Sequence, residues 1–237
     1  EVRVLLDCLD PHPSLTLAGD TQQHLMATSG FTSWSAFLDE LGIPGAEIET
    51  LKISYRSSRE IASFVQAVLG PLREDEPPLA PRSGPPVELF RFTDRGAAVA
   101  FLADALRELE TSEPLASVAV LTPSRAHTLA YHDGLSRCDL RRLRLVADQD
   151  FTFSPGVEVT EVEQAKGLEF DYVVLVDVDA DAYPESDEAR RRLHVGATRA
   201  VHQLWLTSFG TPSPLAAPLA TPTSSPSRLK SPPPERP

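Results

Sequence analysis

The sequence predicts an α/β fold, a parallel β-sheet with helices on both faces. Short apolar runs alternate with amphipathic helical patterns along most of the 237 residues. Parallel strands need a crossover connection between them, so this alternation implies a parallel sheet covered on either side by helices. With 41% hydrophobic and 24% charged residues, the chain can build one sizeable core or two small ones.

The first part of the chain predicts separate elements without a sheet of their own. Residues 1–7 read as a helix already under way, because no capping residue precedes them. Residues 15–18 are a strand-like run that ends at Gly19. Residues 34–41 show a short amphipathic helical pattern, and residues 50–53 are strand-like again.

A longer helix is predicted over residues 57–69. Ser57 and Glu60 have the Ser-x-x-Glu spacing of a capping box at its start. Residues 71–86 are rich in proline and acids and poor in apolar side chains, which is typical of a linker. The remaining expected elements are strands over residues 87–92, 118–121, 172–176 and 204–207, and helices over residues 97–109 and 124–135.

Two segments are predicted to lack regular structure. Residues 136–156 read as a loop. From Gly210 onward proline, serine, threonine and alanine dominate, so a disordered or extended tail is expected over residues 210–237.

The charge balance limits the kinds of partner. A net charge of −12 and a pI near 4.9 argue against a surface that binds DNA non-specifically, because the phosphates would be repelled. The arginines nevertheless cluster in two places, Arg137, Arg141, Arg142 and Arg144, then Arg190, Arg191 and Arg192. For the first cluster we favour ion-pair partners or a solvated helix face, whereas for the second a basic track is equally weighted.

The cysteines and the apolar runs indicate the compartment. Cys8 and Cys138 offer neither a disulfide framework nor metal-ligand spacing. No signal peptide opens the sequence, and no apolar run is long enough to cross a bilayer. We therefore expect a cytoplasmic protein that does not bind membranes or metal ions through its own residues.

Two dense motifs lie between residues 157 and 206. Residues 164–171 read Q-A-K-G-L-E-F-D, and residues 191–200 read R-R-L-H-V-G-A-T-R-A. Each is followed by an apolar strand-like run, so the first is a turn at a strand start and the second a helix that delivers Arg199 to a shared edge. A guanidinium there suits a phosphate anion, because it offers a fork of donors with a fixed charge.

These residues resemble motifs V and VI of the UvrD/Rep-type superfamily 1 helicases. Residues 17–23, L-A-G-D-T-Q-Q, resemble the G-D-x-x-Q of motif III, and residues 54–58, S-Y-R-S-S, resemble the Y-R-S of motif IV. Four motifs in the family's order, spanning about residues 5–208, are a strong signal. The resemblance implies a RecA-like domain, which is a P-loop NTPase fold.

Two motifs of a complete nucleotide-binding site are missing from this sequence. The sequence has no G-x-x-x-x-G-K-[ST] loop to cradle phosphates and no D-E-x-x-D segment ahead of Gly19. The resemblance therefore implies three parts: a remnant of a first motor domain over residues 1–46, a second RecA-like domain over residues 47–209, and the tail over 210–237. The expected cofactor is ATP, with Mg²⁺ supplied by an N-terminal motor domain that this sequence does not include.

The resemblance also implies roles for three polar side chains at the nucleotide. Arg199 corresponds to the motif VI arginine finger, which stabilises charge on the transferred phosphoryl group. Arg56 corresponds to the motif IV arginine that contacts the γ-phosphate. Gln23 corresponds to the motif III glutamine that senses the γ-phosphate across the cleft.

Further roles follow for the motif V turn and for two aromatic residues. Glu169 corresponds to the glutamate that contacts the ribose of ATP, and Gly167 would allow close backbone approach there. Lys166 faces either a phosphate or solvent. Trp34 is either a base-stacking residue for single-stranded DNA or a buried tryptophan. Tyr55 either stacks on a base of the nucleotide or packs within the protein, and we favour a place in the core or behind the residues that contact the nucleotide.

Two departures modify what the resemblance implies. Glu163 stands where motif V usually has a histidine, and a carboxylate there opposes contact with DNA phosphate. Residues 136–156 leave no room for the large domain that UvrD-type enzymes insert at this point, which resembles compact, HelD-like branches, some of which act on RNA polymerase. The predicted function is half of an ATP-dependent DNA helicase or translocase. The alternatives are a non-catalytic protein-binding module and an RNA polymerase-associated factor.

Overall fold

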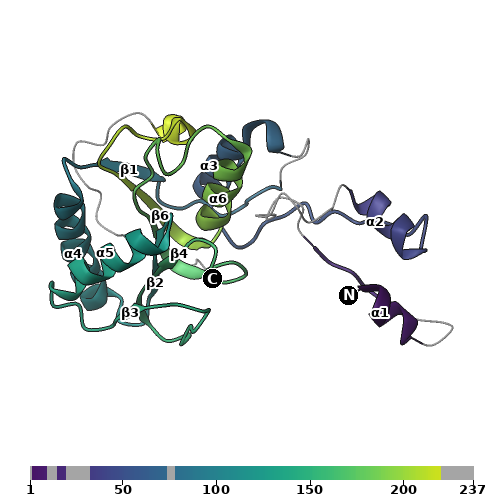
Figure 1. Ribbon diagram of the computed structural model, residues 1–237, viewed down its shortest axis with the longest axis horizontal. Helices are drawn as coiled ribbons and strands as arrows, with labels where there is room; N and C mark the ends of the chain where they lie inside the picture. The colour runs from purple at the N-terminus through teal and green to yellow at the C-terminus, as the bar shows by residue number, and fades with distance from the viewer. Residues whose placement is uncertain (1, 10–14, 20–32, 74–77, 220–237) are drawn as a thin grey trace. The chain divides into compact units, whose positions relative to one another are not determined.

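The computed structural model describes residues 2–9, 15–19, 33–73 and 78–219, and the chain divides into two compact units, Glu1–Leu51 and Lys52–Pro237. The first unit contains α1 (Val2–Asp7) and α2 (Trp34–Leu41) (Figure 1). The predicted helix over residues 34–41 is therefore confirmed. It begins where the Ser33 hydroxyl accepts the Ala36 N–H, and it ends at Gly42, whose φ of 81° a residue with a side chain rarely adopts. The strand expected over residues 15–18 is wrong, because those residues form no strand.

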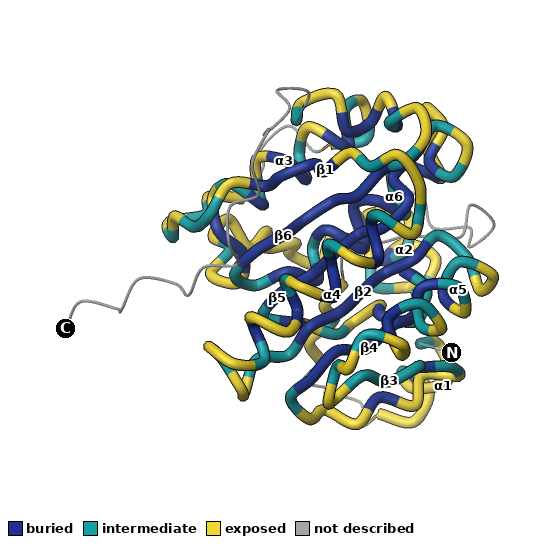
Figure 2. The backbone as a smooth tube through the Cα atoms, turned by 90° about the vertical axis from the view of Figure 1, so that its left-hand side faces the viewer, coloured by how far each residue is buried: buried dark blue, intermediate teal, exposed yellow. Residues whose placement is uncertain are grey.

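The second unit is built on a six-stranded sheet in which every neighbouring pair is parallel, with the order β1-β6-β5-β2-β4-β3. This confirms the predicted fold class. The strands are β1 (Glu88–Arg91), β2 (Ser117–Thr122), β3 (Leu143–Leu145), β4 (Gly156–Glu161), β5 (Phe170–Leu175) and β6 (Ala200–Ser208). The central strands are buried along most of their length (Figure 2), as parallel strands with helices on both faces must be.

Two pairs of helices cover the sheet (Figure 1). The helices α4 (Arg95–Ser112) and α5 (Arg125–Ser136) pack together on one face, and α3 (Arg59–Leu69) and α6 (Asp187–Ala197) pack together on the other. On the α4 side, Leu102 and Leu106 join a core that includes Trp205 of β6. The Trp205 ring lies edge-on to Phe90 of β1, with 5.0 Å between centroids, which is a favourable aromatic geometry.

The start of α3 differs from the predicted capping box. Ser58, not Ser57, caps the helix by accepting the Ile61 N–H. The Glu60 carboxylate instead accepts the Gly84 N–H at 2.7 Å. The predicted box fails because the Ser57 hydroxyl is used in a tertiary contact with another strand.

Two strands were absent from the sequence prediction. The structure places β3 within residues 136–156, which were expected to form a loop, and β4 directly after them. Gly156 begins β4 with a φ of 135°, and a Cβ there would lie 2.6 Å from the Arg142 carbonyl oxygen. A glycine is therefore required where these two strands come together.

The expectation of a disordered or extended tail is wrong for residues 210–219. Pro214–Leu219 form a 3-10 helix, η2, in which Leu215 and Ala216 are buried. The Ser213 hydroxyl donates to the Tyr183 carbonyl at 2.6 Å and fixes the start of this turn. Residues 220–237 lie outside the described part of the chain.

A second 3-10 turn, η1 (Gly70–Leu72), follows α3. None of the described helices is long and apolar enough to cross a membrane.

Candidate functional site

The two motif strands begin side by side, at the amino edge of the sheet. Phe170 of β5 is in register with Ala200 of β6, and the Phe170 N–H donates to the Arg199 carbonyl at 2.9 Å. Glu169 and Arg199, which immediately precede these strands, therefore lie at the same edge. The sheet register brings motif V and motif VI together.

Motif IV is joined to the same edge by a buried hydrogen bond. The Ser57 hydroxyl donates to the Ala200 carbonyl at 2.9 Å, so the chain before α3 is held against the start of β6. Arg82 adds a second link, because its guanidinium donates to the carbonyls of Arg56 and Val201. Arg56 thus lies beside the motif V turn.

The side chains of Arg56 and Glu169 form an ion pair. The Arg56 Nε lies 2.6 Å from the Glu169 Oε1, and the two side chains are 46% and 44% exposed. Because both groups remain accessible to solvent, their mutual attraction is modest and either can exchange its partner for a ligand. Two of the residues expected to contact ATP are therefore in direct contact with each other.

Arg199 lies at this edge with its side chain directed into the protein. It is 1% exposed, and its Nε donates to the Val195 carbonyl at 2.9 Å. Its Nη1 donates to the Leu168 carbonyl at 3.1 Å, and its Nη2 to the Thr198 hydroxyl at 3.0 Å. In this structure Arg199 therefore ties the end of α6 to the motif V turn.

The motif V turn has the backbone expected of its glycine. Gly167 has a φ of 85°, and a Cβ added there would meet nothing within 4 Å. The turn is thus left-handed at this residue and open above it, which leaves space for another molecule to approach the backbone. Lys166 beside it is exposed.

The departure at Glu163 is compensated within the chain. Its Oε1 lies 2.7 Å from the Nε of Arg192, and the Nη2 of Arg192 also lies 3.0 Å from Glu188. Arg190 similarly pairs with Glu185 at 2.9 Å. Two members of the second arginine cluster are therefore ion-paired, which favours ion-pair partners over a basic track.

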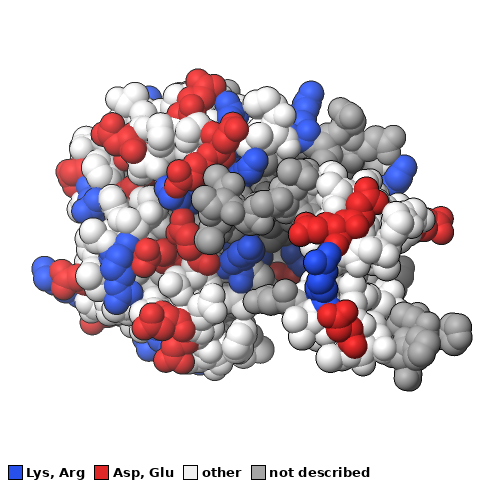
Figure 3. All heavy atoms as spheres, turned by 45° about the vertical axis from the view of Figure 1, so that its right-hand side comes forward, with Lys and Arg blue, Asp and Glu red and all other residues white. Residues whose placement is uncertain are grey.

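The first arginine cluster is also engaged with acids. Arg137 pairs with Asp133 at 2.7 Å, and Arg144 pairs with the buried Glu158 at 2.8 Å. The interpretation as ion-pair partners is confirmed for these two residues. Figure 3 shows the same mixing, because basic and acidic side chains lie next to each other over the face it displays.

The remaining predicted site residues lie elsewhere. Gln23 falls outside the described residues. Trp34 belongs to the first unit, where its half-buried ring lies edge-on to Phe37 at 6.1 Å, and a Cβ at Gly19 would lie 2.9 Å from it. Tyr55 is 74% exposed, so the expectation that it packs in the core is wrong.

Sequence reasoning missed a polar network at the amino edge. The Asp171 carboxylate accepts the Ser117 N–H and hydroxyl, both at 2.8 Å, and lies 3.4 Å from the His202 Nε2. The Tyr172 hydroxyl donates to Glu113 at 2.8 Å, and burial together with that carboxylate raises the pKa of Tyr172. The only signal in the sequence was Asp171 at the end of motif V.

A second missed group lies at the opposite, carboxyl edge. Asp177 follows β5, is buried, and has a φ of 55°, which is unusual for a residue with a side chain. Tyr131 donates to its carboxylate, and Arg95 pairs with it at 3.3 Å. Burial raises the pKa of Asp177 despite these partners. Among the described residues, no group of three or more His, Cys, Asp or Glu could hold a metal ion.

Known proteins with similar features are helicases. Residues 156–207, which contain motifs V and VI, match the UvrD-like helicase C-terminal domain family. The chain is similar to the C-terminal domain of a possible DNA helicase from Lactobacillus plantarum WCFS1, with 26% identity, a TM-score of 0.59, and coverage of 71% of this chain and 95% of that one.

Two other structures are more distant. The PRRSV helicase is 16% identical over 71% of this chain and 25% of that chain, with a TM-score of 0.36. The UvsW helicase from bacteriophage T4 is 10% identical over 51% of this chain and 46% of that chain, with a TM-score of 0.37. These scores are too low to support an argument. No curated protein matches the chain, and nothing in the comparisons supports an association with RNA polymerase. Residues 156–207 are therefore similar to the C-terminal domain of UvrD-like helicases, and they lie on a parallel sheet that matches the RecA-like fold of a helicase C-terminal domain.

Proposed function

We propose that the chain is the C-terminal half of an ATP-dependent DNA helicase or translocase. In this proposal it supplies one wall of an ATP site shared with an N-terminal motor domain. The observation that carries the proposal is the meeting of Arg56, Glu169 and Arg199 at one edge of the sheet. A protein scaffold needs no accessible pair of an arginine and a carboxylate beside the motif V turn.

The residues at this edge fit a nucleotide. The accessible guanidinium of Arg56 suits phosphate oxygens, and the accessible Glu169 carboxylate can accept a hydroxyl hydrogen of a ribose. Gly167, two residues before Glu169, leaves the backbone of the motif V turn open. The exposed ring of Tyr55 is a flat apolar surface for a base. Bound ATP would supply the phosphoryl bond whose hydrolysis drives movement, and the N-terminal domain would supply Mg²⁺.

Arg199 has a different part in this proposal. Its hydrogen bonds to Val195, Leu168 and Thr198 hold it inward, so acting as an arginine finger requires it to release the Val195 and Leu168 carbonyls. Gln23 would sense the γ-phosphate and couple hydrolysis to movement. Trp34 and Lys166 would face single-stranded DNA, since a ring can stack on any base and an ammonium attracts phosphate.

The isolated chain provides the first test. With one wall of the site, it should show no ATP hydrolysis above a blank in a coupled-enzyme assay. Turnover by the purified chain that disappears in Arg199→Ala would contradict the proposal, because the chain would then hold a complete site.

A second candidate function is a non-catalytic protein-binding module. The burial of Arg199 favours it, because a guanidinium fully used inside the protein serves stability without a ligand. The coding sequence immediately upstream separates the two candidates. A Walker A loop followed by a D-E-x-x-D segment favours the motor, whereas an unrelated domain favours the module.

A further inference from the structure

Phe153 combines two unfavourable features in one residue. Its side chain is 82% exposed, and its φ of 52° lies in the left-handed region, where a bulky residue is a genuine outlier. Asp148 and Gln149 in the same loop also have positive φ values. A glycine at position 153 would relieve the backbone and remove the apolar exposure, so the ring does not stabilise its own fold, and a contact outside the fold would account for it.

The loop that carries Phe153 is held firmly in place. The Gln149 N–H donates to the Gln164 side chain at 2.9 Å, and Arg144 donates to the Ser154 carbonyl at 3.0 Å. Phe151 is buried and lies 6.2 Å from the ring of Phe170. With one aromatic anchored inward and the loop bonded on both sides, the Phe153 ring projects from a fixed position.

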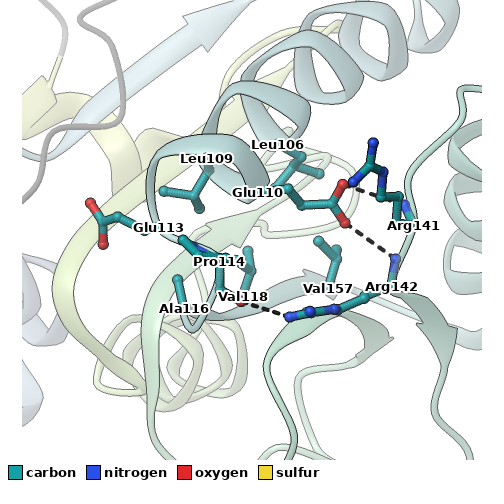
Figure 4. A pocket seen from close by; sticks show the side chains of 11 residues that line it. Leu106, Leu109, Glu110, Glu113, Pro114, Ala116, Val118, Arg141, Arg142 and Val157 are labelled. Carbon is teal, nitrogen blue, oxygen red and sulfur yellow. Dashed lines mark hydrogen bonds between the residues drawn. The ribbon is translucent and has the colours of Figure 1, made fainter.

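A cavity opens at the same edge of the sheet. Its volume is about 110 Å³, and Figure 4 shows it between the end of α4 and the starts of β2 and β4. Gly156, three residues after Phe153, forms part of its wall. Gly156 is in register with Ser117 of β2, and the neighbouring Leu115 is 79% exposed. The exposed ring and the cavity therefore belong to one surface.

The cavity suits an aromatic ring. Its apolar lining is contributed by Leu106, Leu109, Ala116, Val118 and Val157. An enclosed apolar cavity of about 150 Å³ binds a benzene molecule, so a slightly smaller, open one can accept most of a phenyl ring. The Phe153 ring of the same chain does not fill it, because that ring is exposed to solvent.

Charges on this surface are complementary. Asp148 and Asp150 are exposed beside Phe153, and neither forms an ion pair with another residue of the described part. Arg141 and Arg142 stand at the cavity, where their backbone N–H groups donate to Glu110 and Arg142 also donates to the Pro114 carbonyl (Figure 4). The Arg141 side chain is exposed. The carboxylates beside Phe153 would repel nucleic acid and attract an arginine-bordered pocket.

We propose that this surface is an interface between two copies of the chain. Each copy inserts Phe153 into the cavity of the other, and Asp150 of one faces Arg141 of the other. A surface that carries both a protruding ring and a matching cavity is self-complementary, which is the requirement for a two-fold symmetric contact. The proposed contact uses the Phe153 loop and the cavity rather than the Arg56 and Glu169 pair, and it does not depend on the proposed motor function.

Sedimentation velocity of the 237-residue chain over a wide concentration range tests this directly. The weight-average mass should rise from 25.8 kDa towards twice that value. Phe153→Gly should weaken association at least about tenfold, because it removes the ring; at concentrations where the wild-type chain is monomeric it should raise the thermal midpoint, because it relieves the backbone. If Phe153 served only to stabilise its own fold, Phe153→Gly would lower the thermal midpoint instead. Leu129→Ala, an exposed apolar residue on α5, is the matched control and should leave association unchanged.

A charge exchange identifies the partner surface. Arg141→Glu and Asp150→Arg should each weaken association, and the double variant should restore it, since the pair would re-form in the opposite sense across the interface. The proposal is overturned by a chain that stays monomeric at every concentration, by undiminished dimerisation of Phe153→Gly, or by a double variant no better than the single ones. It is also overturned if Phe153→Gly dimerises like the wild type and loses only its binding to a fluorescent oligo-dT strand, because Phe153 would then be a nucleic-acid contact.

Discussion

The Nε of Arg56 lies 2.6 Å from the Oε1 of Glu169, so two residues from motifs IV and V neutralise each other at the edge of the sheet. The pair is about half exposed, which makes it weak and exchangeable. In the proposed motor, a nucleotide would replace both halves of this contact, offering phosphate to the arginine and ribose to the carboxylate. The ion pair would then keep the edge ordered between catalytic cycles.

Removing this pair should have little effect on stability. Glu169→Gln should change the free energy of unfolding by less than about 1 kcal/mol, because exposed ion pairs contribute about that much or less. Urea denaturation at low and high salt measures it. At high salt, the difference in the free energy of unfolding between the wild type and Glu169→Gln should largely disappear, because salt screens an exposed ion pair. A loss of several kcal/mol would mean that the pair is a structural element rather than an exchangeable contact.

Arg199 should behave in the opposite way. Arg199→Ala leaves the Leu168 carbonyl without its side-chain donor, removes one of the two side-chain donors to the Val195 carbonyl and empties a buried position, so we expect a loss of roughly 2–4 kcal/mol in the free energy of unfolding. Chemical denaturation provides the measurement. Arg137→Ala, which breaks an exposed ion pair, is the control and should stay within about 0.5 kcal/mol of the wild type. Equal stability of the two variants would show that the inward bonds of Arg199 are not formed in solution.

Gly196 should be intolerant of a side chain because α6 lies close to the sheet. A Cβ there would lie 2.6 Å from the Leu175 Cδ2 and 3.4 Å from Val162. Gly196→Ala should therefore lower the free energy of unfolding by about 1–3 kcal/mol, despite the better helix propensity of alanine. Gly96→Ala in α4 is the matched control, since its Cβ would meet only the Asp94 carboxylate, at 3.0 Å. Thermal unfolding of both variants measures this difference. A Gly196→Ala variant that is more stable than the wild type would contradict the close packing of α6 against the sheet.

Asp177 should make the chain less stable as the pH rises. Burial raises its pKa in the folded protein above the ordinary 3.8, so the folded state holds this proton more tightly than the unfolded state does. The stabilisation of the folded state that this proton provides is fully present below pH 3.8, and it is lost as the pH rises through the higher folded pKa. The stability of Asp177→Asn relative to the wild type should therefore increase as the pH rises from 3.8 through the folded pKa, and it should then stay constant. Denaturant titrations across acidic and neutral pH measure this difference, and a flat or falling difference would contradict the assignment.

The sequence predicted those elements whose signals are local. The helix over residues 34–41 follows from its apolar spacing and from Ser33 and Gly42 at its ends. The strand β4 was missed because Glu158 interrupts its apolar run, and that buried carboxylate is compensated by its pair with Arg144 of β3 and by the Thr152 hydroxyl. No local pattern reveals such a tertiary compensation.

The same distinction applies to the candidate site. The motifs identified Arg56, Glu169 and Arg199. The sheet register places Glu169 and Arg199 at one edge, and the hydrogen bond from Ser57 to Ala200 brings Arg56 there. The direction in which the Arg199 guanidinium points depends on the carbonyl of Leu168, which becomes its neighbour only after folding. Tyr55 was misplaced for a related reason, because an aromatic residue in a short motif carries no signal of which neighbours will cover it.

The most direct test of the shared ATP site is the steady-state ATP hydrolysis rate of a longer chain that includes the upstream motor domain. Arg56→Ala and Arg199→Ala should each lower kcat by about a thousandfold or more, as expected for charges that stabilise a transferring phosphoryl group. Arg91→Ala, at the exposed end of β1, should leave the rate unchanged. Wild-type rates in both Arg56→Ala and Arg199→Ala would contradict the account.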